Sequence, residues 1–76
     1  MNMPKNNNLL TLLSLAEEIA LKKIDGHLTI MRFTTHWKCM LGTPNLDSDS
    51  GRTEVGELQY FNTLEEALRN LIILHN

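Results

Sequence analysis

Residues 27–42, HLTIMRFTTHWKCMLG, hold the one long run of β-branched, aromatic and sulfur-containing residues in this 76-residue chain. Such residues favour a pleated, half-buried surface, and the polar group Thr34, Thr35 and His36 divides the run, so the stretch predicts a β-hairpin. A two-residue turn at Thr34-Thr35 would need positive φ at two β-branched residues. A three-residue loop with His36 in the left-handed region is therefore expected.

The loop length sets the register of the hairpin and so decides which side chains share a face. With Phe33 opposite Trp37, the expected core face collects Met31, Phe33, Trp37, Cys39 and Leu41. The other face then carries Leu28, Ile30, Arg32, Lys38 and Met40. This register sets Arg32 beside Lys38 as a like-charge pair, and a slip of one residue would exchange several assignments.

Helical periodicity marks a first helix over residues 9–24, where the apolar residues recur at helical spacing. Asn8 is placed to cap its start, and Glu18 and Lys22 are spaced for an i,i+4 ion pair. Asp25-Gly26 is expected to end the helix, because glycine readily adopts the left-handed conformation of a helix stop.

A second helix is expected to begin at Thr63, which forms a capping box with Glu66, and to end near Leu74. Residues 57–61 between the hairpin and this helix predict a third short strand. Residues 43–56, rich in Pro, Asn, Asp, Ser and Gly, predict a long surface loop.

The predicted order is α-β-β-β-α, an α+β fold in which a three-stranded antiparallel sheet packs both helices on one face. The other face of the sheet is expected to be open. Residues 1–8, rich in Asn and broken by Pro4, predict a disordered tail, and residues 9–76 predict a single domain.

Composition excludes several classes of function. A net charge of −2 argues against the broad positive field of nonspecific nucleic-acid binding. No apolar run approaches the roughly 18–20 residues of a membrane span, so no membrane association is expected. The single Cys39 allows no internal disulfide and favours the cytoplasm.

No motif points to an enzyme, a cofactor or a metal site. The acidic loop around Asp47 and Asp49 has the wrong residues at the sixth and twelfth positions of a calcium loop. His36 and Cys39 lie three residues apart, but a nucleophile or metal site would need further groups that the sequence does not supply.

The α-β-β-β-α order resembles that of double-stranded-RNA-binding domains. Those domains begin the second helix with lysines that contact phosphates, whereas this chain has acidic residues at 65 and 66, which would repel them. Residues 26–44, GHLTIMRFTTHWKCMLGTP, are similar to segments of short uncharacterised bacterial and phage proteins. The closing strand and the TLEEAL helix start are similar to those of antitoxin-like domains.

The leading functional hypothesis is a small non-enzymatic protein that binds a protein partner, as an adaptor, a regulator or a phage-type inhibitor of a host machine. Surplus apolar surface supports it. The expected partner-binding residues are Ile30, Arg32, His36, Lys38 and Met40. A homodimer is also expected, formed through Leu10, Leu15 and Ile73.

Two alternatives remain open at this point. The first is a nucleic-acid-binding module that uses Arg32, Lys38 and His36 on the open sheet face, with Phe33 or Trp37 nearby for stacking. The second is a metal- or thiol-dependent enzyme.

Overall fold

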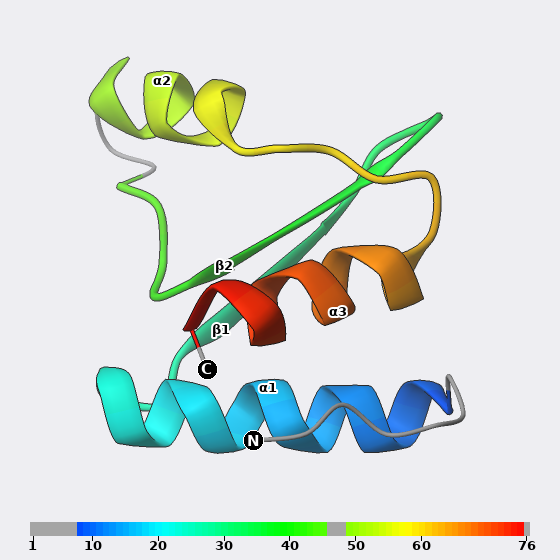
Figure 1. Ribbon diagram of the computed structural model, residues 1–76. Coiled ribbons are helices and arrows are strands. Elements are labelled where there is room, and N and C mark those ends of the chain that lie inside the picture. The colour runs from blue at the N-terminus through cyan, green and yellow to red at the C-terminus, as the bar shows by residue number, and fades with distance from the viewer. Residues whose placement is uncertain (1–7, 46–48, 76) are drawn as a thin grey trace.

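The computed structural model describes residues 8–45 and 49–75, which form three helices and one hairpin. Figure 1 shows two of the helices on one side of the hairpin and the middle helix on the other. The α+β class is confirmed, whereas the three-stranded sheet and two-helix layout are wrong. The predicted tail lies outside the described residues, apart from Asn8. The elements are α1 (Leu9–Lys23), β1 (Leu28–Arg32), β2 (Trp37–Leu41), α2 (Asp49–Glu57) and α3 (Leu64–His75).

The hydrophobic core is centred on the contact between α1 and α3. Ala16 and Ala20 are fully buried, and such small side chains let two helices approach closely. Leu28, Cys39 and Leu41 of the hairpin pack against this helix pair. The buried residues are Leu12, Ala16, Ile19 and Ala20 of α1, with Ala67, Leu68, Leu71 and Ile72 of α3.

The ends of α1 follow the sequence signals. The Asn8 side-chain oxygen accepts hydrogen bonds from the amides of Leu10 (2.9 Å) and Thr11 (3.4 Å). At the other end Gly26 adopts a φ of 97°, and its amide donates to the Ala20 carbonyl at 3.1 Å. The Glu18–Lys22 ion pair is also present, at 3.4 Å.

Thr63 and Glu66 begin α3 as predicted, but with one of the two bonds of a capping box, since the Glu66 carboxylate bonds the Thr63 hydroxyl rather than the Thr63 amide. The Thr63 hydroxyl oxygen accepts from the Glu66 amide at 3.1 Å, and the same hydroxyl donates to the Glu66 carboxylate at 3.0 Å. Two acidic residues in the first turn, Glu65 and Glu66, further suit the positive end of the helix dipole.

The predicted hairpin register is wrong by one residue. Arg32 pairs with Trp37, and the Phe33 amide donates to the His36 carbonyl at 2.8 Å. The chain therefore reverses at Thr34-Thr35 in a two-residue connection. None of the described non-glycine residues has a positive φ, so this turn avoids the conformation that β-branched residues resist.

This register reverses the predicted faces of β1 while keeping those of β2. Paired residues of antiparallel strands point to the same side. Lys38 now lies opposite Met31 rather than beside Arg32, and the predicted like-charge pair does not form. The side facing α1 and α3 carries Leu28, Ile30, Arg32, Trp37, Cys39 and Leu41, and the other side carries Thr29, Met31, Lys38 and Met40.

The segment predicted as a loop contains α2, which lies over the side of the sheet expected to be open (Figure 1). The Lys38 ammonium donates to the Val55 carbonyl in the last turn of α2 at 2.8 Å, and Lys38 is only 8% exposed. A side chain on Gly51 would collide with the Asn45 carbonyl oxygen. Tertiary contacts thus form a helix that local propensity does not predict.

The predicted third strand is reduced to a single bridge. Trp37 and Phe61 exchange two backbone hydrogen bonds, of 2.7 and 2.9 Å, and no longer ladder follows among the described residues. α2 takes up Glu57, the first residue of the predicted strand, and the Leu58 amide still donates to the Val55 carbonyl at 3.2 Å.

Replacing Lys38 with Met should release α2 while leaving the helix core folded. A hydrogen bond from a charged group contributes about 1.5–3 kcal/mol, so the population with α2 detached should rise about 10–100-fold. Trypsin cleavage after the exposed Arg52, followed by mass spectrometry, measures this. The matched control is Lys22→Met, which removes only an exposed ion pair, and equal cleavage rates in the two variants would contradict the assignment.

Candidate functional site

Three aromatic rings meet at the tip of the hairpin. Phe33 and His36 stack with ring centroids 4.8 Å apart, and Tyr60 approaches His36 at 5.0 Å in a tilted arrangement. Tyr60 is 64% exposed. Thr35 and His36 also share a hydrogen bond of 2.9 Å between the hydroxyl and the ring nitrogen Nδ1. The tip therefore presents a cluster of aromatic rings in which Tyr60 is exposed.

Two cations lie over rings beside this cluster. The Arg32 guanidinium is 4.9 Å from the centroid of the Trp37 ring, and the Lys38 ammonium is 5.7 Å from that of Phe33. Such contacts stabilise the cation at the ring face. Arg32 is exposed, whereas Lys38 is buried and already bonded to Val55. Arg32 is therefore the cation of this pair that a ligand reaches.

The outer edge of β2 is largely free. Both backbone groups of Trp37 point away from β1, since they bond Phe61, and alternation gives Cys39 and Leu41 the same outward direction. No described residue forms a backbone hydrogen bond with Cys39 or Leu41 on that side. An edge of this kind offers donors and acceptors to an added strand.

This free edge opens into a hollow of about 300 Å³ between β2, α3 and residues 58–61. Its walls are mostly apolar, with Asn70, Gln59 and His75 as polar groups. Leu74 stands at its rim and is 68% exposed. The apolar lining residues are Cys39, Met40, Leu41, Leu58, Phe61, Ala67, Leu71 and Leu74.

Cys39 lies in this hollow as a half-buried thiol. Burial raises the pKa of the Cys39 thiol to about 11, because desolvation disfavours the thiolate. The thiolate is the nucleophile and metal ligand, so this environment suppresses both activities. Among the described residues, no group of three or more His, Cys, Asp or Glu side chains converges to hold a metal ion.

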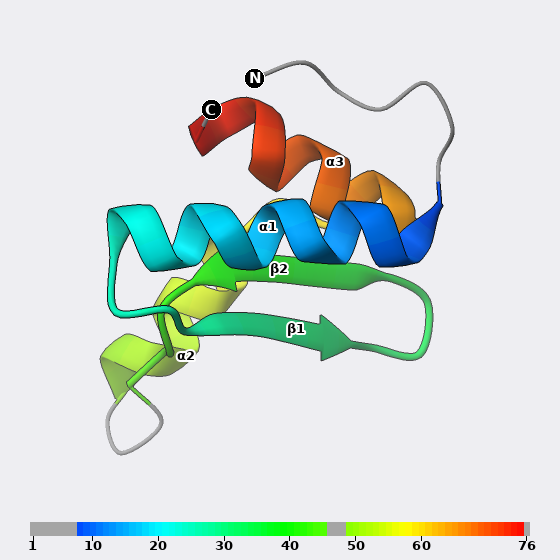
Figure 2. The same ribbon diagram turned by 90° about the horizontal axis from the view of Figure 1, so that it is seen from below.

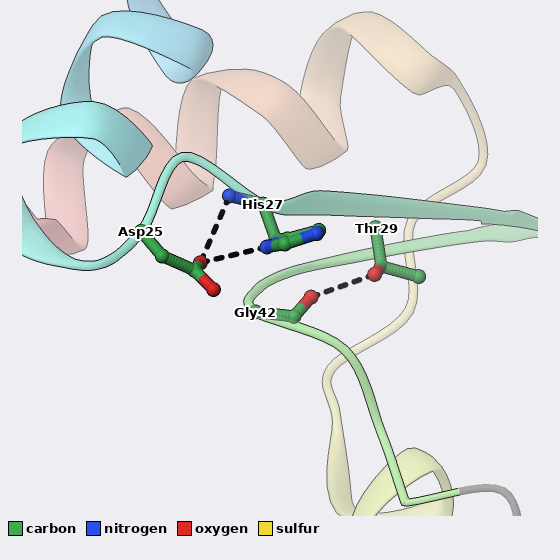
Figure 3. A network of polar contacts seen from close by, with 4 residues as sticks. All are labelled: Asp25, His27, Thr29 and Gly42. Carbon is green, nitrogen blue, oxygen red and sulfur yellow. Dashed lines mark hydrogen bonds and ion pairs between the residues drawn. The ribbon is translucent and has the colours of Figure 1, made fainter.

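A polar network closes the open end of the hairpin (Figure 3). Asp25 accepts hydrogen bonds from the His27 ring at 2.8 Å and from the His27 amide at 3.2 Å, and the Thr29 hydroxyl donates to the Gly42 carbonyl at 2.6 Å. The bond from the His27 side chain lowers the pKa of Asp25 below its ordinary 3.8. The ionised Asp25 thus stabilises the fold above about pH 3.8, and this stabilisation is lost as the pH falls through the lowered pKa. Of these contacts, the bond between Thr29 and Gly42 joins the two strands of the hairpin.

The residues predicted to bind a partner do not lie on one face. Ile30 and Arg32 point to the side of α1 and α3, Lys38 and Met40 point to the side of α2, and His36 lies at the tip. The structure adds Tyr60, Leu58, Phe61 and Asn70, which reach the tip or the hollow only through the fold, and no local sequence signal marks them.

The residues predicted to form a dimer also differ in their surroundings. Leu10 and Ile73 are exposed, at 71% and 59%, whereas Leu15 is half-buried against the core.

The chain matches no protein-family model, no curated protein and no solved structure. Within the part of the chain that the structure describes, no helix is both long enough and apolar enough to cross a membrane.

Alkylation of Cys39 should be slow. At pH 8 a thiol with a pKa near 11 has about 100-fold less thiolate than a thiol with the ordinary pKa of 9.0. The thiolate of higher pKa is the stronger nucleophile, which offsets part of this loss. The alkylation rate should therefore be about tenfold lower than that of an ordinary thiol. Iodoacetamide labelling of the native chain and of the urea-unfolded chain gives the comparison. A native rate equal to the unfolded rate would show that the thiol is accessible and ionised.

Proposed function

We propose that this protein is a small non-enzymatic binding protein that takes an extended segment of a protein partner along the free edge of β2. The observation that carries the proposal is the coincidence of an unpaired strand edge at Cys39 and Leu41 with an apolar hollow beside it. A segment laid along a strand edge gains backbone hydrogen bonds, and pockets for alternate side chains then give specificity.

The outer edge of β2 already bonds one residue from another part of the chain in this way. Phe61 exchanges two backbone hydrogen bonds with Trp37, the first residue of β2. A partner strand would bind the same edge next to Phe61, at Cys39 and Leu41. The two outward positions are two residues apart, the spacing at which one strand contacts another through its backbone.

The hollow determines which side chains suit the segment. A volume of about 300 Å³ with walls of Leu41, Leu58 and Leu71 accepts a large apolar side chain. Asn70 and Gln59 offer amide groups at the same wall, which can bond the backbone or a polar side chain of the partner. The favoured ligand is an extended peptide with alternating apolar residues.

Selection of peptides from a displayed random library tests the proposal. We expect enrichment of extended peptides with β-branched or large apolar residues at alternate positions. Leu74→Asp should weaken their binding about 10–100-fold, because a charge then stands at the rim of the hollow and apolar contact is lost. Fluorescence anisotropy with a labelled selected peptide measures the dissociation constant.

The matched control is Ile73→Asp. Ile73 is the neighbouring residue on α3 and is similarly exposed, at 59% against 68% for Leu74, but it lines a different hollow, with Phe61, Glu66, Arg69 and Asn70. The control should bind as the unaltered chain does. Equal loss in both variants, or no selected peptide, would refute the binding site.

A second candidate function rests on the aromatic tip. Tyr60, which is tilted against His36 and exposed, is suited to stack on a nucleobase, and Arg32 supplies a nearby positive charge. The buried position of Lys38 and the net charge of −2 disfavour it relative to the peptide site.

An oligothymidine of about twelve nucleotides, titrated at low and high salt, separates this candidate from the first. Loss of one base stack in Tyr60→Ala should weaken binding about 5–100-fold. Tyr60→Phe keeps the ring and should bind normally. Absence of a salt-dependent anisotropy change would eliminate the nucleic-acid function.

A further inference from the structure

The outer edge of β1 is a second unpaired strand edge. The Phe33 amide and the His27 carbonyl both bond across to the other strand and its extension, at 2.8 Å each. Alternation therefore directs the backbone groups of Leu28, Ile30 and Arg32 outward. No described residue forms a backbone hydrogen bond with them, and Figure 2 shows β1 at the margin of the hairpin, on the side away from α3.

A shallow apolar hollow of about 460 Å³ lies next to this edge, between α1 and β1. Leu21 is 70% exposed there, and Ile30 is 36% exposed. Leu10, 71% exposed, continues the same stripe of α1 at helical spacing. The residues lining the hollow are Leu13, Glu17, Leu21, Gly26, Leu28 and Ile30.

We propose that this edge and the adjoining stripe of α1 form the interface of a homodimer. β1 pairs antiparallel with β1 of a second copy, which produces a four-stranded sheet in the order β2-β1-β1-β2. A two-fold axis at Ile30 gives the register in which every residue of β1 has a partner. In this register each residue whose backbone groups point outward lies opposite another such residue of the second copy. Hydrogen-bonded pairs can therefore form along the whole strand.

The side chains make the edge complementary to itself. In this register Ile30 lies against Ile30 of the second copy, and Leu28 lies opposite Arg32 of the second copy. Arg32 and Leu28 point to the same side of the sheet, and Glu17 lines the same hollow as Leu28. The guanidinium of one copy is thus brought toward the Glu17 carboxylate of the other, and symmetry repeats the contact. This charge match favours a second copy over an unrelated strand.

A standard-size interface removes about 800 Å² of each partner from water, which is roughly a sixth of the 5205 Å² surface of this chain. The surface differs from the one predicted from sequence: it retains Leu10 but not Leu15 or Ile73. It also lies on the strand opposite the peptide site, so the dimer leaves the edge of β2 free.

Sedimentation velocity of the full chain tests the dimer. We expect a dimer at about 100 μM, well above the micromolar dissociation constant of a modest interface. Ile30→Lys should give a monomer, because two buried ammonium groups would then face each other. The matched control Ile73→Lys should remain dimeric. A monomeric unaltered chain, or a dimer that Ile30→Lys preserves, overturns the proposal.

Cross-linking tests the register without relying on a disruptive substitution. Hydrogen-bonded residues of antiparallel strands have Cα atoms about 5.5 Å apart, within the range of a disulfide. In a chain whose Cys39, which lies directly opposite Ile30 across the hairpin, is replaced by Ala, Ile30→Cys should therefore form a disulfide-linked dimer on mild oxidation. Met31→Cys should not, because Met31 lies opposite Thr29 of the second copy. Efficient cross-linking at 31 but not at 30 overturns the register.

Charge exchange tests the contact between Glu17 and Arg32. Glu17→Arg and Arg32→Glu should each weaken the dimer about tenfold, an effect of the size seen for close interfacial charges. The double variant should regain most of the affinity. Failure of the double variant to recover shows that the two groups do not meet and overturns this part of the interface.

Discussion

A two-stranded hairpin is marginally stable by itself, so the structure depends on the apolar contact between α1 and α3. Leu12, Leu68 and Ile72 are the largest side chains that this contact buries completely. The hairpin packs half-buried side chains, Leu28, Cys39 and Leu41, against the two helices, which support it. The helices cover the two faces of the hairpin, α1 and α3 on one side and α2 on the other, and leave backbone groups at both edges available.

Local signals predicted the ends of α1 and α3 well, because the chemistry of those ends is contained in a few neighbouring residues. Asn8 and Thr63 bond amides within the next three residues, and Gly26 supplies a conformation that few other residues adopt. The register of the hairpin is harder to predict from sequence. β1 has apolar residues at both alternations, with Ile30 on one side and Met31 on the other, so the pattern could not select a face and the turn decided the register.

α2 and the candidate site required contacts between distant segments. Lys38 in a strand suggested an exposed charge, but its ammonium instead reaches a carbonyl 17 residues along the chain. The helix that buries it has weak intrinsic preference, since residues 49–57 contain two glycines and one valine. Tyr60 likewise joins His36 only because residues 58–61 return to the hairpin. Arg32 is exposed and His36 lies at the hairpin tip, but the residues packed around them could not be predicted from local sequence.

The pairing of α1 with α3 also constrains how the chain is made. α1 leaves the ribosome before α3, with an apolar stripe, including Leu12 and Ile19, whose main contact in the fold is with α3. The hairpin between them can close early, since its contacts are local, but the core is a long-range contact and must wait. During that interval the nascent chain exposes the surface that later becomes its most protected interior.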